Sequence, residues 1–567
     1  MTPQTAQPEP SARPTLAGLR LLALSLLTGL LTGVVAVAFR AAVHALEDGS
    51  DALQHAAGPA AWLLRFVGPA LAGLAAGLLL YRVLRVHAGH GVPAVIEATV
   101  RDKPLADWRM AAKAGTSSLV IGGGGSAGPE GPIVEIGAVG GSYLWKWFRL
   151  GQEELRILMG GGAAAGIAAV FSAPLGGVLF VLEVILRDYR LRTIAPIMLA
   201  SVAGSSVAQY AYGTAPTLTL ARPEQIGASV YLLCLAVGLA AGLLSAGFIR
   251  ISETIGQRMA AWKEPAWRKP LLGGLCVGVL AAMVGPVGGA GYALIEQLAH
   301  EPLLWTTVLA LLAAKLLATA LTLGSGAPGG AFAPSLVLGA CLGALCCRYP
   351  LGTPADLPAA VLLGLCGMIA GTFQAPLTAI LISFKIGHHH SDMLVPLLAT
   401  AAISSWLAGH AVSGNYYDWA LLRRGLRLDT ARQFKLLLEG RSVGEVMQTG
   451  SESLTPEQTL GQILDLVSRS RQDLYPVLDQ DRQILGVVHI DLIRQTIRSG
   501  DLEHGLIVQD LLESPPPFVT PQTGLDEAWN LFQSIATDEL LVVESLSDGR
   551  PPRVVGWLTR GAITSLR

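Results

Sequence analysis

The side chain with the most distinctive chemistry in this sequence is Glu130, which lies in the glycine- and proline-rich segment GSAGPEGPIVEIG between apolar runs. An ionisable group at membrane depth is costly to keep and is a functional group by default. At the start of a half-helix, an ionised carboxylate resembles a bound anion and can occupy its place, whereas a protonated one can leave. The alternative, a carboxylate that caps a surface helix, is disfavoured by the apolar flanks. Glu135, five residues on, either caps or pairs.

Three short loops share one composition: GHGVP at 89–93, GPEGP at 128–132 and GGAFAP at 329–334. Glycine lets the backbone approach a ligand closely, and proline suits the first turn of a helix. Free backbone N–H groups at helix N-termini bind anions, and the helix macrodipole adds partial positive charge. The loops therefore predict an anion site lined by backbone amides. Close helix packing is the alternative, and it is the interpretation we give to glycines such as those at 160–162.

The elements that must position these loops occur twice. Pro132 and Pro334 lie 202 positions apart, as do Gly137 and Gly339, and FSAPLGGVLF recurs at the same spacing as FQAPLTAILI. Paired, Gly/Pro-interrupted apolar segments are typical of transporters whose site lies where two repeats meet near the bilayer midplane. The sequence therefore predicts an all-α polytopic membrane protein of two inverted repeats with broken helices.

Composition supports a membrane protein. Of 567 residues, 51% are hydrophobic and 14% are charged, and the mean hydropathy is +0.50. Uncharged runs of spanning length cover residues 21–39, 227–249, 270–295, 316–347 and 357–384. The run at 316–347 is too long for one span, so it predicts two helices or half-helices joined within the bilayer, where irregular backbone must be buried or line a cavity.

Other features exclude other classes of protein. The net charge of −1 gives no reason to expect a nucleic-acid partner, and six cysteines without metal spacing read as small buried hydrophobes. We interpret His388, His389 and His390 as a solvated loop rather than a metal site. Residues 1–18 are polar and rich in proline, which predicts a disordered tail. No nucleophile, base and orienting group can be assembled, so an enzyme is disfavoured.

From residue 429 the chain has the composition of a soluble domain. Arg423, Arg424 and Arg427 follow the last apolar span, which places this end in the cytoplasm by the positive-inside rule. The segment repeats at a spacing of 65 residues, as SVGEVM and IVQDLL and as LTPEQTL and VTPQTGL. In each copy we expect Thr-Pro to open a helix that precedes two apolar strands. This predicts two α/β modules at about 441–500 and 506–567.

From about residue 19 to the end, the chain resembles the CLC family of chloride channels and proton/chloride exchangers with a C-terminal pair of CBS domains. The three loops in order, the repeat and the tyrosine of GNYYDW carry the resemblance. It implies a transmembrane domain at 19–428, a cytoplasmic CBS pair at 429–567 and a homodimer in the cell (inner) membrane with a pathway in each subunit. It also implies chloride transport gated by Glu130. The implied anion-binding residues are Gly89, His90, Gly91, Gly128, Gly131, Ala331, Phe332 and Tyr417, with Tyr416 as the alternative to Tyr417.

The chain departs from the family pattern in four places. His90 replaces a serine, which leaves the anion preference open; Pro129 replaces a basic residue, and Lys385 replaces a frequent glutamate. Val184 occupies the position where exchangers carry an internal proton-relay glutamate, directly after Glu183. The sequence therefore favours channel-like or weakly proton-coupled chloride flow, and a proton/chloride exchanger is the alternative. A magnesium transporter is less favoured because it needs several acidic residues along the pathway, and a regulatory sensor is the third hypothesis.

The CBS pair lacks the acidic residues with which such modules hold adenine nucleotides. The two sets of positions for the nucleotide-binding turn are Gly486, His489 and Leu492, and Gly556, Thr559 and Ala562. Both acid positions are apolar, and Asp491 is one residue out of place. The sequence therefore favours a dimerising scaffold over a nucleotide site, and we expect no other cofactor.

Overall fold

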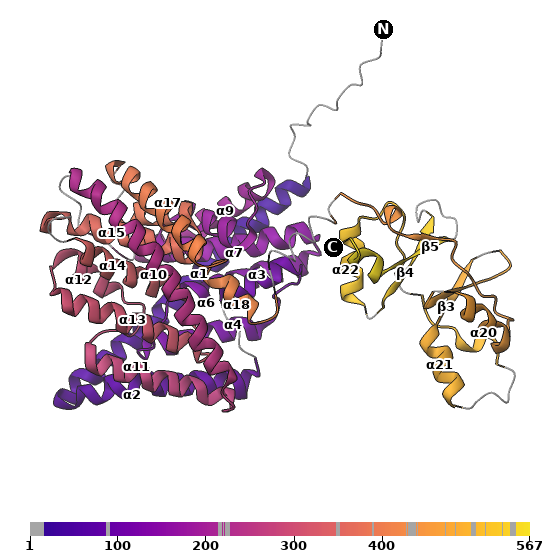
Figure 1. Cartoon of the computed structure of the whole chain (residues 1–567), viewed down its shortest axis with the longest axis horizontal. Helices are drawn as coiled ribbons and strands as arrows, with labels where there is room; N and C mark the ends of the chain where they lie inside the picture. The colour runs from indigo at the N-terminus through magenta and orange to yellow at the C-terminus, as the bar shows by residue number, and fades with distance from the viewer. Residues whose placement is uncertain are drawn as a thin grey trace, which may run out of the picture. The chain divides into compact units, whose positions relative to one another are not determined.

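The computed structural model describes residues 16–566 apart from 87–90, 214–217, 219, 221–226, 348–351, 388–390, 427, 429–437, 439, 471, 482, 500–505, 516, 536 and 545–551. It divides into two compact units, residues 1–427 and 428–567. Figure 1 shows the first, helical unit from indigo to orange and the second from orange to yellow. The first helix begins at Leu16, so residues 16–18 belong to it and not to the predicted tail, the rest of which lies outside the described residues.

The first unit is helical, and its helices fall into two sets that follow the sequence repeat. The first set comprises α1 (Leu16–Ala57), α2 (Ala61–Leu78), α3 (Val92–Val100), α4 (Trp108–Gly115), α5 (Ser117–Gly122), α6 (Glu130–Phe148), α7 (Gln152–Phe171), α8 (Pro174–Phe180), the π-helical turn η3 (Val181–Leu186) and α9 (Leu191–Tyr212). The second comprises α10 (Ala228–Ala261), α11 (Lys269–Val284), α12 (Tyr292–His300), α13 (Trp305–Gly324), α14 (Phe332–Cys346), α15 (Leu357–Phe373), α16 (Pro376–Ile386), α17 (Leu394–Ala411) and α18 (Tyr416–Leu422).

The spacing of 202 residues recurs where the helices break: α6 and α14 begin 202 residues apart, α7 and α15 end 202 apart, and α8 and α16 begin 202 apart. Helices α7 and α15 end at Phe171 and Phe373, and the next residues, Ser172 and Gln374, both adopt a left-handed backbone with φ of 51° and 53°. In each repeat an Ala-Pro pair then opens the next helix, because proline fits the first helical turn without a lost hydrogen bond. The predicted repeat of broken helices is therefore confirmed.

Glycines bring the helices of each repeat close together. A Cβ on Gly162 would lie 2.0 Å from the carbonyl oxygen of Gly137, and a Cβ on Gly364 would lie 2.0 Å from that of Gly339. These two contacts join α6 to α7 and α14 to α15, and the residues are again 202 apart. Helices α2 and α11, and likewise α8 and α16, are equivalent elements that pack on each other, and α2 and α11 run side by side in Figure 1.

Eight helical segments among the described residues are long and apolar enough to cross a membrane: 18–84, 152–171, 192–212, 229–261, 266–284, 305–324, 354–373 and 391–422. The apolar run at 316–347 is divided between α13 and α14, as predicted. The expectation that all cysteines are buried is confirmed for Cys234, Cys341 and Cys366 but is wrong for Cys276, which is exposed on α11, while Cys346 and Cys347 are partly exposed. An apolar thiol on the surface of a spanning helix can face lipid as readily as protein.

The second unit contains the four predicted strands, β2 (Leu474–Leu478), β3 (Ile484–His489), β4 (Glu539–Glu544) and β5 (Arg553–Thr559). Strand β2 pairs antiparallel with β3, and β5 pairs antiparallel with β4 and with the short β1 (Gln448–Thr449). Their helices are α20 (Leu460–Arg469), α21 (Ile490–Ser499), α22 (Leu525–Ser534) and α23 (Arg560–Thr564).

The prediction that Thr-Pro opens a helix in each CBS copy is wrong. Pro456 and Pro521 lie in turns, and the helices begin four residues later, at Leu460 and Leu525. In the first copy the N–H of Thr459 donates to the side chain of Gln462, a pairing typical of a helix N-terminus. Proline suits a turn as well as a first helical turn, so the dipeptide alone does not locate the start.

Candidate functional site

The three glycine loops meet at the contact between the two repeats. Gly128 and Gly330 form an isolated antiparallel bridge in which each N–H donates to the other's carbonyl oxygen at 2.8 Å. A Cβ on Gly131 would lie 3.2 Å from Cα of Gly330, and a Cβ on Gly91 would lie 3.2 Å from Cα of Gly131. Gly91 also has a φ of 69°, which favours glycine. Glycine at these positions therefore allows the loops to approach at backbone distance.

Each loop leads directly into a helix. Helices α6 and α14 begin at Glu130 and Phe332, and α3 begins at Val92, and no residue before them supplies a side-chain cap. The first turn of a helix leaves backbone N–H groups without helical partners and carries partial positive charge. Three helix N-termini are thus directed toward one region.

Glu130 is buried, with 1% of its surface exposed, and its carboxylate bends toward the second repeat. The hydroxyl of Tyr292 donates to Oε1 at 2.8 Å. Oε2 makes no hydrogen bond of normal geometry, and a Cβ on Gly128 would lie 2.2 Å from it and 3.1 Å from the backbone nitrogen of Ala333. The carboxylate therefore lies at the N-terminus of α14, the helix equivalent to its own.

Aromatic rings surround the start of α14. Phe332 stacks on Phe373 at a centroid distance of 5.1 Å, and Phe373 stacks on Tyr417 at 5.0 Å. The side chain of Asn415 accepts the N–H of Tyr417 and donates to the carbonyl of Phe373, so the first turn of α18 is fixed against α15. Tyr416, the alternative, instead stacks on Phe248 at 5.4 Å.

A cavity of about 500 Å³ lies on one side of the loops. Its wall contains four of the predicted anion-binding residues, Gly91, Gly131, Ala331 and Tyr417. Tyr416 lines it as well, together with the basic residues Lys269, Arg423 and Arg424. Gly128 and Phe332 do not line this cavity, and Gly89 and His90 lie outside the described residues.

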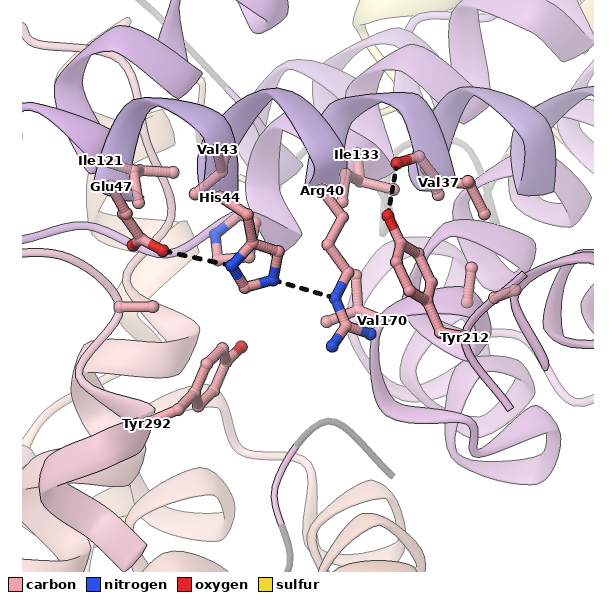
Figure 2. Close-up of a pocket in the computed structure, with 15 residues that line it drawn as sticks. Val37, Arg40, Val43, His44, Glu47, Ile121, Ile133, Val170, Tyr212 and Tyr292 are labelled. Carbon is pink, nitrogen blue, oxygen red and sulfur yellow. Dashed lines mark hydrogen bonds and ion pairs between the residues drawn. The ribbon is translucent and has the colours of Figure 1, made fainter. Parts of the chain in front are cut away.

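A smaller cavity, of about 60 Å³, lies on the other side of Glu130. Pro129 and Tyr292 line it, and Figure 2 shows Arg40, His44 and Glu47 along the side of α1 that faces it. Since Pro129 lines the small cavity and Gly131 the large one, the residue between them, Glu130, is the buried partition between two cavities.

Glu135 makes contacts that sequence reasoning left open. Its Oε1 forms an ion pair with the ammonium of Lys113 at 2.6 Å, and its Oε2 accepts the N–H of Gly91 at 2.8 Å. Both charged side chains are buried. The amide of Gly91 is thus occupied by a carboxylate, so in this structure Gly91 contributes close backbone approach rather than a free donor.

Val184 is buried in η3, and both carboxylate oxygens of the preceding residue, Glu183, accept hydrogen bonds. Oε1 of Glu183 accepts the N–H of Leu377 at 2.9 Å, and Oε2 accepts the N–H and the hydroxyl of Thr378 at 2.7 and 2.6 Å. Glu183 therefore caps the N-terminus of α16, the equivalent helix of the other repeat. The residue 202 positions later, Lys385, is in the last turn of α16.

No group of three or more His, Cys, Asp or Glu side chains is placed to hold a metal ion among the residues that the structure describes, and the three histidines at 388–390 are not among them. In the CBS unit, the hydroxyl of Thr559 accepts the N–H of Ala562 and so caps α23. Nδ1 of His489 accepts the N–H of Asp491.

Two helical repeats, broken helices at their contact and a partition carboxylate between two cavities define a membrane transport protein. A family model described as voltage gated chloride channel matches residues 72–409, and a CBS domain model matches residues 443–498. The chain belongs to this family of chloride transport proteins, the CLC family, with a C-terminal CBS pair. Its members are transporters or channels and not enzymes.

The similar proteins include one named as a chloride channel protein and one named as a proton/chloride exchange transporter. A Ralstonia nicotianae protein named as a ClcB-like chloride channel protein is 32% identical over 429 residues, which cover 73% of this chain and 98% of the relative. The H(+)/Cl(-) exchange transporter ClcA of Yersinia pseudotuberculosis is 28% identical over 446 residues, covering 76% and 93%. The crystal structure of a slow cyanobacterial Cl-/H+ antiporter matches 72% of this chain and 99% of its own with a TM-score of 0.65 and 26% identity. The chain is therefore a chloride transport protein of the CLC fold.

Proposed function

We propose that chloride crosses the membrane through a pathway that Glu130 opens and closes, and that the flow is channel-like or only weakly coupled to protons. The observation that carries this proposal is the position of the Glu130 carboxylate at the N-terminus of α14, between two cavities. A helix N-terminus binds anions, so the ionised carboxylate competes with chloride there. Protonation removes its charge and with it the competition.

The anion site that we propose uses the loops in different ways. The first turn of α14, at Ala331 and Phe332, supplies amides, and Tyr417 supplies a hydroxyl from the opposite wall. Gly128 and Gly131 allow the close approach of the second and third loops. Gly91 likewise allows close approach of the backbone and offers no free amide, because its N–H donates a hydrogen bond to the carboxylate of Glu135. Gly89 and His90 complete the proposed site.

Weak coupling is supported by the surroundings of Val184. A valine side chain neither binds nor transfers a proton, and the neighbouring Glu183 is held by three hydrogen bonds to the start of α16. A proton/chloride exchanger is the second candidate, because the similar proteins include an exchange transporter and an antiporter. In that mechanism a proton must reach Glu130 from the large cavity without a carboxylate at position 184.

We propose that the protein is a homodimer in the inner membrane and that its CBS pair lies in the cytoplasm. The large cavity then opens to the cytoplasm, since Arg423 and Arg424 line it and basic residues are enriched on that side. We propose that the CBS pair acts as a scaffold, because Leu492 and Ala562 occupy its acid positions and the hydroxyl of Thr559 caps a helix.

The test is the simultaneous measurement of chloride efflux and proton movement from proteoliposomes, with wild type, Glu130→Gln and Val184→Glu. We expect wild-type chloride flux to rise as the pH falls, because the neutral carboxyl leaves the N-terminus of α14. Glu130→Gln should fold normally and give flux that no longer depends on pH, since an amide does not titrate in this range. Wild type should not drive protons uphill under a chloride gradient.

Wild-type pH dependence in Glu130→Gln would exclude Glu130 as the gate. Robust uphill proton transport by the wild type would instead assign the protein to the exchanger class. If proton transport appears only in Val184→Glu, the missing carboxylate is the reason for weak coupling.

A further inference from the structure

The hydrogen bond from Tyr292 to Glu130 connects the two repeats at the partition between the cavities. Tyr292 is the first residue of α12, and its hydroxyl lies 2.8 Å from Oε1 of a residue 162 positions away. A hydrogen bond to an ionised acceptor is stronger than one to a neutral acceptor. This contact therefore stabilises the charged form of Glu130 in the position observed here.

The loop before Tyr292 is fixed by a buried ammonium. Lys315 on α13 donates to the carbonyl oxygens of Val287, Gly288 and Gly289 at 3.0, 3.3 and 2.9 Å, and its side chain is buried. On its other side the loop is tied to the first repeat, since the N–H of Gly289 donates to the carbonyl of Gly125. Tyr292 is thus held by a segment bonded to both repeats.

Tyr292 lines the small cavity, whereas Glu130 lies behind it and does not line the cavity. In Figure 2, the Tyr292 ring lies across the cavity from His44 and Arg40. Nδ1 of His44 lies 3.4 Å from a carboxylate oxygen of Glu47, and Nε of Arg40 donates to Nε2 of His44 at 3.3 Å. Water and ions that enter the cavity therefore meet Tyr292 before Glu130.

Several titratable or charged groups surround this contact in the part of the chain that the structure describes. They are Arg40, His44 and Glu47 on α1, Lys315 on α13 and Tyr417 on α18. The hydroxyl of Tyr292 donates a hydrogen bond directly to the carboxylate of Glu130, at 2.8 Å. Tyr292 therefore acts on this carboxylate at the shortest range.

We propose that Tyr292 is a positioning residue, whose hydroxyl holds the ionised carboxylate of Glu130 at the N-terminus of α14 and keeps the pathway closed. This inference rests on the proposed role of Glu130 as the gate. Protonation of Glu130 weakens the hydrogen bond as well as removing the charge, so both changes release the side chain together. Opening toward the small cavity then requires the carboxyl to leave Tyr292.

The test is the pH profile of chloride flux for Tyr292→Phe in proteoliposomes. Without the donor the charged carboxylate is less stable, so Glu130 takes up a proton at higher pH. We expect the midpoint of the flux profile to move up by about one pH unit, as for the loss of one charge-assisted hydrogen bond. A purely structural role would lower total flux without moving the midpoint.

The matched control is Tyr212→Phe. Tyr212 lines the same cavity, but its hydroxyl donates to the carbonyl of Val37 at 3.1 Å, so the wild-type midpoint should be kept. The double variant Tyr292→Phe/Glu130→Gln should behave like Glu130→Gln alone, because Tyr292 acts through that carboxylate. A wild-type midpoint in Tyr292→Phe would overturn the inference while leaving Glu130 as the gate. Unchanged pH dependence in Glu130→Gln would overturn the proposed function itself.

A second substitution tests the same inference if Tyr292→Phe does not purify as a single species. Incorporation of 3-fluorotyrosine at position 292 preserves the shape of the ring and makes its hydroxyl a stronger donor. The midpoint should then move to lower pH, opposite to the change in Tyr292→Phe. A midpoint that does not respond to the fluorine would count against Tyr292 as the holding group.

Discussion

Two buried carboxylates on α6 differ in their partners, and this difference separates their roles. Glu135 faces the ammonium of Lys113, whereas Glu130 faces the neutral hydroxyl of Tyr292. A charge that is buried beside an opposite charge is costly to neutralise alone, because its partner is then left unpaired. A carboxylate held by a hydroxyl leaves no such charge behind. Glu130 is therefore the better candidate for a group that changes its charge during transport.

The two neighbouring tyrosines on α18 allow a prediction at the scale of single residues. Tyr417 stacks on Phe373, which stacks on Phe332 at the start of α14, whereas Tyr416 stacks on Phe248. Tyr417→Phe should therefore weaken chloride binding by about 0.5–1.5 kcal/mol, the net contribution of one hydrogen bond. Calorimetric titration with chloride measures the change. Tyr416→Phe serves as the control and should bind like the wild type, and the opposite ranking would assign the site to Tyr416.

At the scale of elements, the ion pair between α4 and α6 fixes the first loop. Lys113 comes from α4, Glu135 from α6, and the bond from Glu135 to the Gly91 amide reaches the start of α3. The three helices are therefore joined through one carboxylate. Gly91 has no side chain with which to pack, so this hydrogen bond to its amide holds it against Gly131.

Breaking this pair should destabilise the membrane unit. Lys113→Met leaves the buried carboxylate of Glu135 without its counter-charge, and the expected loss is about 3–5 kcal/mol. Thermal unfolding in detergent should show a clear decrease in Tm. The double variant Lys113→Met/Glu135→Gln should recover much of the loss, because no unpaired charge remains. Lys146→Met, at an exposed position near the end of α6, is the control, and an equal loss in this variant would contradict the argument.

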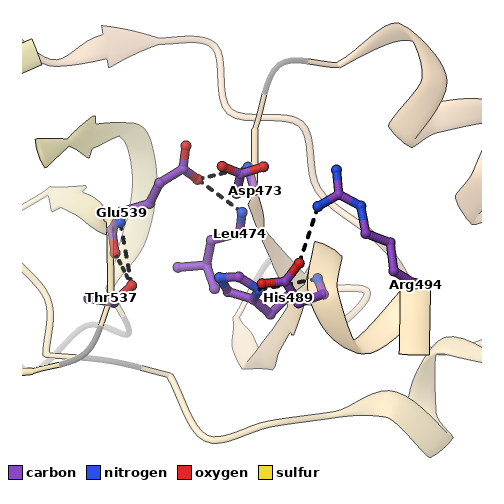
Figure 3. A network of polar contacts seen from close by, with 7 residues as sticks. Asp473, Leu474, His489, Arg494, Thr537 and Glu539 are labelled. Carbon is purple, nitrogen blue, oxygen red and sulfur yellow. Dashed lines mark hydrogen bonds and ion pairs between the residues drawn. The ribbon is translucent and has the colours of Figure 1, made fainter. Parts of the chain in front are cut away.

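At the scale of the whole molecule, the second unit has its own buried carboxylate, which joins its two halves. Oε2 of Glu539 on β4 accepts the N–H groups of Asp473 and Leu474, at the start of β2, at 3.0 and 2.9 Å, as Figure 3 shows. Burial raises the pKa of the Glu539 carboxyl, and these two amides lower it in part. The CBS halves are therefore connected by a contact that responds to pH.

The sign of the pH effect follows from the raised pKa. The folded CBS unit binds the proton of Glu539 more tightly than the unfolded chain, so this contribution to stability is present below the usual pKa of 4.5 and is lost as the pH rises through the folded value. Hydrogen exchange of the β2 amides in the full chain should show an opening free energy that falls over this range. Glu539→Gln should lack this dependence, whereas Glu544→Gln, at the exposed end of β4, should keep it. Identical profiles in all three proteins would contradict the prediction.

The sequence by itself determined the features that are periodic or local. A spacing of 202 residues predicted that α7 and α15 are equivalent, and glycine and proline predicted where helices break, because these residues act on their own backbone. The same patterns located Glu130, since one charge in an apolar segment is visible without any partner. The Thr-Pro prediction in the CBS copies failed because that dipeptide serves a turn and a helix start equally well.

Only the tertiary structure decided which groups meet Glu130 and its neighbours. Tyr292 lies 162 residues from Glu130, and Gly91 lies 44 residues from the carboxylate that occupies its amide. No motif marks Tyr292 or Lys113, and although Lys315 is visible in the sequence as a single charge in an apolar helix, nothing there shows which groups it contacts. Such contacts depend on the angle and register of packed helices, which arise from the whole set of side chains and not from a local pattern.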